Sequence, residues 1–147
     1  MNDATGFDAG AFYLAFVHPV WMVASLGCGV LTLRAGLRLR SARRRGIRKG
    51  AHDYRRHLRF AKPTLVMLWL GFAMGLASAA FLRGWDLFGT AHGLISVTAL
   101  GLFTATATLG RRLEKGATRD PEVHGLLGLG SMLAAAAAFG TGLVLLP

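Results

Sequence analysis

The chain has 147 residues, of which 53% are hydrophobic and 16% are charged, and its mean hydropathy is +0.45. This composition excludes a soluble domain of this size. A formal net charge of +10 would suit a nucleic-acid-binding protein, but no set of stacking aromatic residues accompanies the basic ones, so we expect no nucleic-acid partner.

Four apolar runs divide the chain, and each is long enough to cross a bilayer as a helix. They cover residues 12–33, 65–82, 89–109 and 123–146. A membrane-spanning helix needs roughly 20 residues, and the runs lack the polar alternation of barrel strands. We therefore predict an all-α integral membrane protein, a single domain over residues 1–147 folded as a four-helix up-down bundle. The predicted helices span about 11–36, 54–83, 89–110 and 122–146.

The first predicted helix carries His18 and the lone cysteine, Cys28. Neither a basic segment nor a small-residue cleavage pattern precedes it, so we expect this span to be retained and to target the chain to the membrane. A single cysteine excludes an internal disulfide and the C-x-x-C-H motif that attaches c-type haem. Any haem in this chain would therefore be held noncovalently.

A basic connection, residues 37–53, follows the first helix and dominates the charge of the chain. Of the 17 lysines and arginines, 12 lie between Arg34 and Lys62 and four between Arg111 and Arg119, which leaves only Arg83. Positive residues favour the cytoplasmic side of a membrane. We predict a cytoplasmic loop at 37–53, both termini outside, and a location in the bacterial cytoplasmic membrane. The loop serves as a topology determinant, with binding of anionic lipid or a partner protein as the alternative.

The second predicted helix begins with an arginine-rich stretch, residues 54–59, ahead of Pro63. This stretch is consistent with a helical lead-in followed by a kink at the proline. It contains His57. His52, five residues earlier, would take the role of His57 if the lead-in were not helical, but we favour His57 because it adjoins the span and follows Arg56.

Each predicted helix carries one histidine, since His92 and His124 open the third and fourth. With a helical rise of about 1.5 Å per residue, His18 and His92 belong to the outer half of the membrane, and His57 and His124 to its cytoplasmic interface. Alternate helices stand across the diagonal of an up-down bundle. We therefore expect His18 to pair with His92 and His57 with His124. The similarity of HGLIS at His92 to HGLLG at His124 is treated as a shared motif only.

Two histidines at each of two depths favour one kind of metal site. Ionisable side chains within a membrane are costly and usually functional. Zinc would require four ligands that converge on one point, whereas two ligands suit an iron whose other four positions are filled by a porphyrin. Small residues on the histidine-bearing faces leave room for such a macrocycle, although they are also ordinary in close helix packing.

This ordered set of histidines resembles that of the cytochrome b561 family and its relatives among small bacterial di-haem membrane proteins. The resemblance rests on His18-Pro19, Arg56-His57, His92-Gly93 and His124-Gly125 and covers nearly the whole chain. It implies a four-helix core that binds two b-type haems through the same two histidine pairs. Family members with ascorbate-dependent activity usually have two further flanking helices, which are not found in this sequence, so ascorbate is not assigned as the donor.

Haem binding would involve other side chains besides the ligands. Propionates are anionic and point toward the interfaces, which assigns arginines near each interface to them. These are Arg56 and Arg59 at the inner haem and Arg83 at the outer one. The remaining ring N–H of each ligand needs a carbonyl or hydroxyl acceptor. The candidate hydroxyls are those of Ser25, Ser96 and Thr64.

A six-coordinate iron offers no open position to substrate, so we predict an electron-transfer protein rather than a self-contained enzyme. It would carry single electrons across the membrane between redox partner proteins or quinone, as a homodimer or a subunit of a larger redox complex, with transmembrane oxidoreductase activity. One alternative is a quinol-reactive membrane anchor of an oxidoreductase. Another is a haem-free four-helix transporter or assembly protein with proton-linked histidines, although the spans contain none of the acidic residues of a typical relay.

Overall fold

The computed structural model describes residues 9–47, 51–84 and 86–146. Its long helices are α1 (Ala9–Arg44), α2 (Ala51–Ala77), α3 (Ala91–Glu114) and α4 (Pro121–Leu143). A π-helical segment, η1 (Ser78–Arg83), continues α2, and a short 3-10 turn, η2 (Leu87–Gly89), precedes α3. The four long helices are each long and apolar enough to cross a bilayer. The chain is therefore an integral membrane protein with the predicted all-α fold.

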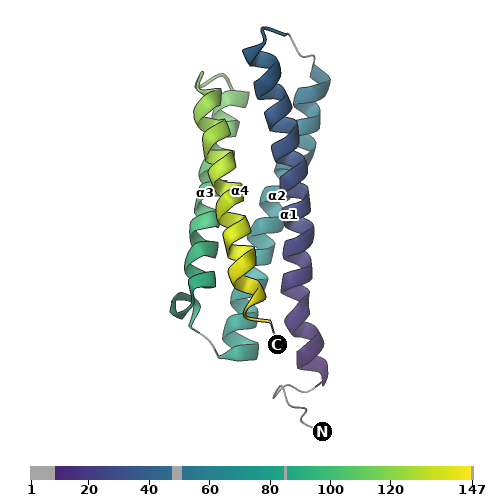
Figure 1. Ribbon diagram of the computed structural model, residues 1–147, viewed down its shortest axis with the longest axis vertical. Coiled ribbons are helices and arrows are strands. Elements are labelled where there is room, and N and C mark those ends of the chain that lie inside the picture. The colour runs from purple at the N-terminus through teal and green to yellow at the C-terminus, as the bar shows by residue number, and fades with distance from the viewer. Residues whose placement is uncertain (1–8, 48–50, 85, 147) are drawn as a thin grey trace.

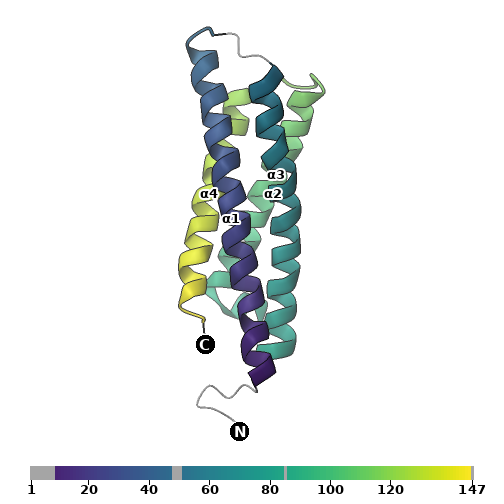
Figure 2. The same ribbon diagram turned by 90° about the vertical axis from the view of Figure 1, so that its right-hand side faces the viewer.

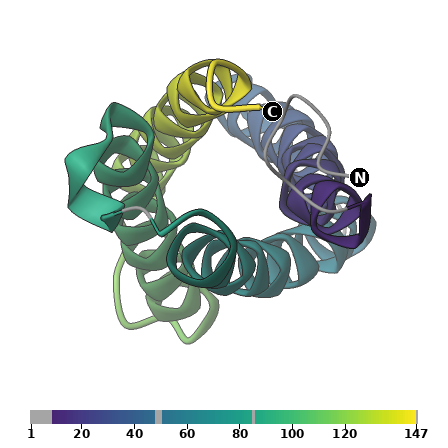
Figure 3. The same ribbon diagram turned by 90° about the horizontal axis from the view of Figure 1, so that it is seen from below.

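The helices run alternately up and down (Figure 1) and form a ring about the bundle axis (Figure 3). α1 packs along α2 and α3 along α4, and the two hairpins meet at α1–α4 and α2–α3. Seen along its axis, the bundle places α1 opposite α3 and α2 opposite α4 (Figure 3). The end with the α1–α2 and α3–α4 connections is called the basic end below, and the opposite end, where Ala9 and Leu146 lie, the termini end.

The helices extend further toward the basic end than the apolar runs suggest. The helix expected at 11–36 continues to Arg44, so residues 37–44, predicted as loop, are helical. The helical lead-in at 54–59 is confirmed, because α2 begins at Ala51. Arginine and leucine are good helix formers, so the change from apolar to charged residues does not end the helix. α1 and α2 reach past α3 and α4 at this end (Figure 2).

Glycine ends two helices at the basic end. Gly46 and Gly116 adopt φ values of 67° and 69°, a left-handed conformation that other residues adopt only with strain. Past each glycine the chain turns back, and the amide of Ile47 donates to the carbonyl of Ala42 at 3.0 Å. The same bond joins Ala117 to Arg112 at 2.8 Å. Both are helix C-terminal caps that satisfy carbonyls left open by the last turn.

The interior of the bundle is made mostly of small residues, and many large apolar side chains face outward. Most of the buried hydrophobic residues are alanines, such as Ala15, Ala99 and Ala135. Val20 and Leu133, by contrast, are 67% and 64% exposed. This distribution suits a lipid environment, where close helix approach depends on small side chains rather than on burial of apolar bulk.

Hydroxyl pairs join the two helices of each hairpin. The Oγ1 atoms of Thr32 and Thr64 lie 3.2 Å apart between α1 and α2, and Thr106 Oγ1 lies 3.1 Å from Ser131 Oγ between α3 and α4. Thr64 and Ser131 are buried. Each pair therefore ties one helix to its neighbour at a defined register.

We expect the Thr106–Ser131 pair to stabilise its hairpin measurably. In a double-mutant cycle of Thr106→Val and Ser131→Ala, the coupling free energy should be about 0.6 kcal/mol, typical of a hydrogen bond between membrane helices. Reversible unfolding in mixed detergent micelles measures it. Thr98→Val, whose hydroxyl donates to the carbonyl of Leu94 in its own helix, should show no coupling to Ser131→Ala. Equal coupling in both cycles would contradict the interpretation.

Candidate functional site

Two pairs of histidine rings face each other inside the bundle. His18 of α1 and His92 of α3 have ring centroids 6.3 Å apart, with planes at 74°. His57 of α2 and His124 of α4 have centroids 6.2 Å apart, with planes at 86°. We call these the termini-end pair and the basic-end pair. The pairing expected across the diagonals is the one in the structure.

Each ring is held by a bond to the backbone of the neighbouring helix. The Nδ1 atoms of His18, His57, His92 and His124 lie 2.9, 3.3, 2.8 and 3.1 Å from the carbonyl oxygens of Gly71, Thr32, Ala138 and Thr106. A carbonyl only accepts, so Nδ1 carries the hydrogen, and in the neutral ring Nε2 keeps its lone pair. This tautomer presents Nε2 for metal binding, with ring orientation set by the bond at Nδ1.

The expected hydroxyl acceptors do not take part in these bonds. The hydroxyl of Ser25 donates to the carbonyl of Trp21 at 2.8 Å, and that of Thr64 to the carbonyl of Phe60 at 2.8 Å. Both bonds stay within one helix, as is common for hydroxyl side chains in apolar surroundings. Backbone carbonyls of the neighbouring helix therefore serve the rings instead.

A glycine underlies every one of the four rings. It stands on the neighbouring helix, four residues after the accepting carbonyl, and therefore on the same face. The glycines under His18, His57, His92 and His124 are Gly75, Gly36, Gly142 and Gly110. A Cβ at these glycines would lie 2.7, 3.4, 2.9 and 3.0 Å from the Cε1 of the ring concerned. A larger side chain would push the ring off its carbonyl in at least three of these places.

A fixed spacing in the sequence reveals these glycines, although the sequence reasoning above did not name them. In each helix the glycine stands 18 residues after the histidine, as in His18 to Gly36 and His92 to Gly110. At about 3.6 residues per turn this is five turns, so both lie on one helical face. In an antiparallel hairpin each helix then gives a histidine at one end and a glycine at the other.

The same set of contacts occurs in both hairpins. The histidine, carbonyl, hydroxyl and glycine positions of α1 recur 74 residues later in α3, as Thr32 does in Thr106. Those of α2 recur 67 residues later in α4, as Thr64 does in Ser131. The chain is thus an internal repeat in which His18 matches His92 and His57 matches His124.

The separation of the rings fits two ligands on opposite sides of one metal ion. Imidazole nitrogens bind first-row metals at about 2.0 Å and lie about 1.1 Å from the ring centroid, so two such rings have centroids about 6.2 Å apart. Among the described residues, no three His, Cys, Asp or Glu side chains gather where they could hold one ion. The donor set therefore fits a metal that brings its equatorial ligands with it, as haem does.

A cavity surrounds the termini-end pair and provides space for such a group. It is lined by both rings, by the glycines that underlie them, and by apolar side chains that include Phe72, Phe103 and Phe139. Arg83 also lines it, and its guanidinium donates to the carbonyl of Leu145 at 2.5 Å. The cavity therefore combines an apolar wall with a cation at the termini end, which suits a macrocycle with carboxylates on one edge.

The other predicted site residues take different positions. His52 is exposed, so the structure favours His57 as the paired histidine. Arg56 and Arg59 are exposed on α2, and with about 100° per residue they lie about 100° and 200° around the helix from His57. Their assignment to haem propionates stays a prediction. Trp85, whose position between Arg83 and Asp86 in the sequence is typical of an aromatic residue at a membrane interface, lies outside the described residues.

Comparison of this chain with known protein families, with curated proteins and with solved structures finds no match. The chemistry of the two histidine pairs therefore has to be inferred from their own geometry and surroundings.

Alanine should have different effects at a glycine that underlies a ring and at a nearby glycine that does not. Gly142→Ala puts a Cβ 2.9 Å from the His92 ring, so we expect it to impair haem binding by the termini-end pair. Gly140→Ala, two residues away with no atom within 4 Å of the added Cβ, should have no effect. Haem titration of the two purified variants checks this. Equal binding by both would show that the glycine does not position the ring.

Proposed function

We propose that the protein is a di-haem b-type cytochrome that carries single electrons across a membrane. One observation carries the proposal: both histidine pairs have the ring separation of two axial ligands, 6.3 and 6.2 Å, and all four rings are held with Nε2 available. The resemblance of the ordered histidines to the cytochrome b561 family supports the same function.

Each part of the site has a role in this function. The histidines hold the metal, the carbonyls set their tautomer and orientation, and the glycines let the rings approach the neighbouring helix. Haem iron with two axial imidazoles supplies reversible one-electron chemistry and has no open position for substrate. The wall of the cavity surrounds the termini-end site with mostly apolar surface. The bundle thereby favours electron transfer over substrate turnover.

The two sites lie at different depths. His18 and Thr32, whose carbonyl accepts from His57, are 14 residues apart on α1, which is about 21 Å at the helical rise of about 1.5 Å per residue. The hydrocarbon core of a bilayer is about 30 Å thick, so the pairs stand toward opposite faces. The positive-inside rule places the basic end in the cytoplasm and both termini outside. Electrons would pass between redox proteins or quinone on the two sides.

The geometry argues against a haem-free proton relay. A histidine that relays protons uses both ring nitrogens, one to receive and one to release. Here each Nδ1–H donates to a backbone carbonyl, which passes no proton on. The fixed tautomer therefore supports a ligand role.

The direct test is the absorption spectrum of the purified protein, oxidised and reduced, with the ratio of haem to protein. We expect two haems per chain. His57→Ala and His124→Ala should each remove the same haem, and His18→Ala and His92→Ala the other, because each pair shares one iron. A chain without haem after expression with ample haem supply would overturn the proposal, and loss in another pairing would overturn the ligand assignment.

The angle between the rings predicts an electron paramagnetic resonance signature. Perpendicular imidazole planes act on different dπ orbitals of low-spin ferric iron and leave them close in energy, which gives strongly anisotropic g values. We expect two such signals, because the ring planes of both pairs are close to perpendicular, at 86° in the basic-end pair and 74° in the termini-end pair. The signal lost in His124→Ala identifies the basic-end site. Weakly anisotropic signals from both sites would contradict this geometry.

A further inference from the structure

Arg40 is one of the cations that the structure brings near the basic-end pair, and Arg43 also acts electrostatically on His124. It lies on α1 one turn beyond Gly36, the glycine under the His57 ring, and residues four apart share a helical face. Its Cδ lies 3.9 Å from the position of a Cβ at Gly125, the residue that follows His124. The side chain of Arg40 thus runs from the helix that supports one ring to the helix that carries the other.

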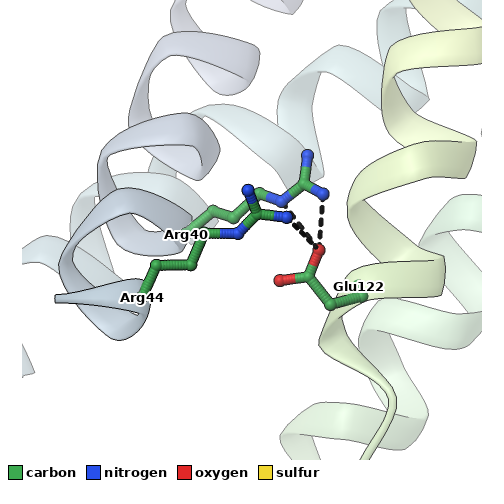
Figure 4. A network of polar contacts seen from close by, with 3 residues as sticks. All are labelled: Arg40, Arg44 and Glu122. Atoms are coloured by element: carbon green, nitrogen blue, oxygen red, sulfur yellow. Dashed lines mark hydrogen bonds and ion pairs between the residues drawn. The ribbon is translucent and has the colours of Figure 1, made fainter. Parts of the chain in front are cut away.

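The guanidinium of Arg40 already holds a carboxylate. Its Nε and one Nη donate to Oε2 of Glu122 at 2.8 and 2.5 Å, and Arg44 donates to the same oxygen at 3.2 Å (Figure 4). The side chain of Arg40 is 25% exposed and that of Arg44 64% exposed. A guanidinium has five N–H donors in one plane, so the bonds to Glu122 leave Arg40 with capacity for a second carboxylate.

The side of the basic-end pair opposite Arg40 carries an acidic residue, Glu114 of α3. Glu114 stands four residues after Gly110, the glycine under His124, and so occupies in α3 the place that Arg40 occupies in α1. Its carboxylate lies 3.9 Å from the Nζ of Lys62. The repeat therefore becomes asymmetric at this end, and an anionic group beside the ring pair is attracted to the Arg40 flank.

We infer that Arg40 binds a propionate carboxylate of the haem at the basic-end site, with Glu122 as an internal carboxylate that competes for the same guanidinium. The inference rests on the proposed function and adds a residue outside the arginines predicted from the sequence. Arg–carboxylate bonds are charge-assisted and among the stronger hydrogen bonds in proteins. Arg44, bound to the same Glu122 oxygen, adds positive charge behind the contact.

The test varies the arginine and the propionate together. Haem b and its dimethyl ester, in which both carboxylates are neutral, are titrated into the full-length apoprotein, and the step lost in His124→Ala identifies the basic-end site. Arg40→Gln should weaken that step for haem b by roughly tenfold or more, in line with a lost charge-assisted bond. It should leave binding of the ester unchanged. Arg38→Gln, the same charge change about 200° around α1, should alter neither.

Substitution of Glu122 distinguishes propionate binding by Arg40 from an ion pair that only holds α1 against α4. If Arg40 serves the propionate, Glu122→Gln should bind haem b as tightly as the unmodified chain or more tightly, because the competitor loses its charge. Arg40→Lys should restore part of the haem affinity that Arg40→Gln loses. Because lysine keeps the ion pair with Glu122, this variant also serves as the test if Arg40→Gln folds poorly.

Three results would overturn the inference while leaving the proposed function intact. One is equal weakening of haem b and of the ester by Arg40→Gln. Another is full binding of haem b by that variant. The last is a Glu122→Gln variant that loses haem b as Arg40→Gln does, which would assign the ion pair to holding the helices together. Failure of the unmodified chain to bind any haem would instead overturn the proposed function.

Discussion

The bond from a histidine Nδ1–H to a backbone carbonyl of the neighbouring helix is the contact on which the interior depends. A helical carbonyl has two lone pairs, so it accepts from the ring while keeping its own helical bond. At three of the four rings this approach depends on a glycine one turn further, as Gly75 is for His18. Helix spacing, ring orientation and the free Nε2 all follow from this one contact.

Repetition of that contact explains why the bundle has two equivalent sites. Exchange of each helix with the one opposite corresponds to a half-turn about the bundle axis (Figure 3), and it turns His18 into His92 and His57 into His124. Each site takes one ring from each hairpin, so neither hairpin can build a site alone. The hydroxyl pairs Thr32–Thr64 and Thr106–Ser131 hold the register of the two helices within each hairpin. The sites shared between the hairpins need this register.

The two sites differ mainly at their edges, where the repeat breaks down. At the basic end Arg40 and Glu114 occupy matching places with opposite charges. At the termini end Arg83 lines the cavity beside the rings. Identical ligand sets can therefore differ in their electrostatic surroundings, which is how a protein tunes two chemically equal centres.

The four spans, the up-down order and the two depths of the histidines can be derived from the sequence, because the length of an apolar run and the distribution of charge act locally on insertion into a bilayer. The diagonal pairing follows from them, since His18 and His92 share a depth and alternate helices face each other. Which atoms hold the rings depends instead on how the helices pack. The acceptors are backbone carbonyls, which every residue has. Residue types therefore could not reveal these bonds and instead suggested the hydroxyls of Ser25 and Thr64 as acceptors. The tertiary structure also brought Arg40 of α1 against α4, near Gly125 and in contact with Glu122, because the meeting of α1 with α4 is a packing outcome that no local pattern encodes.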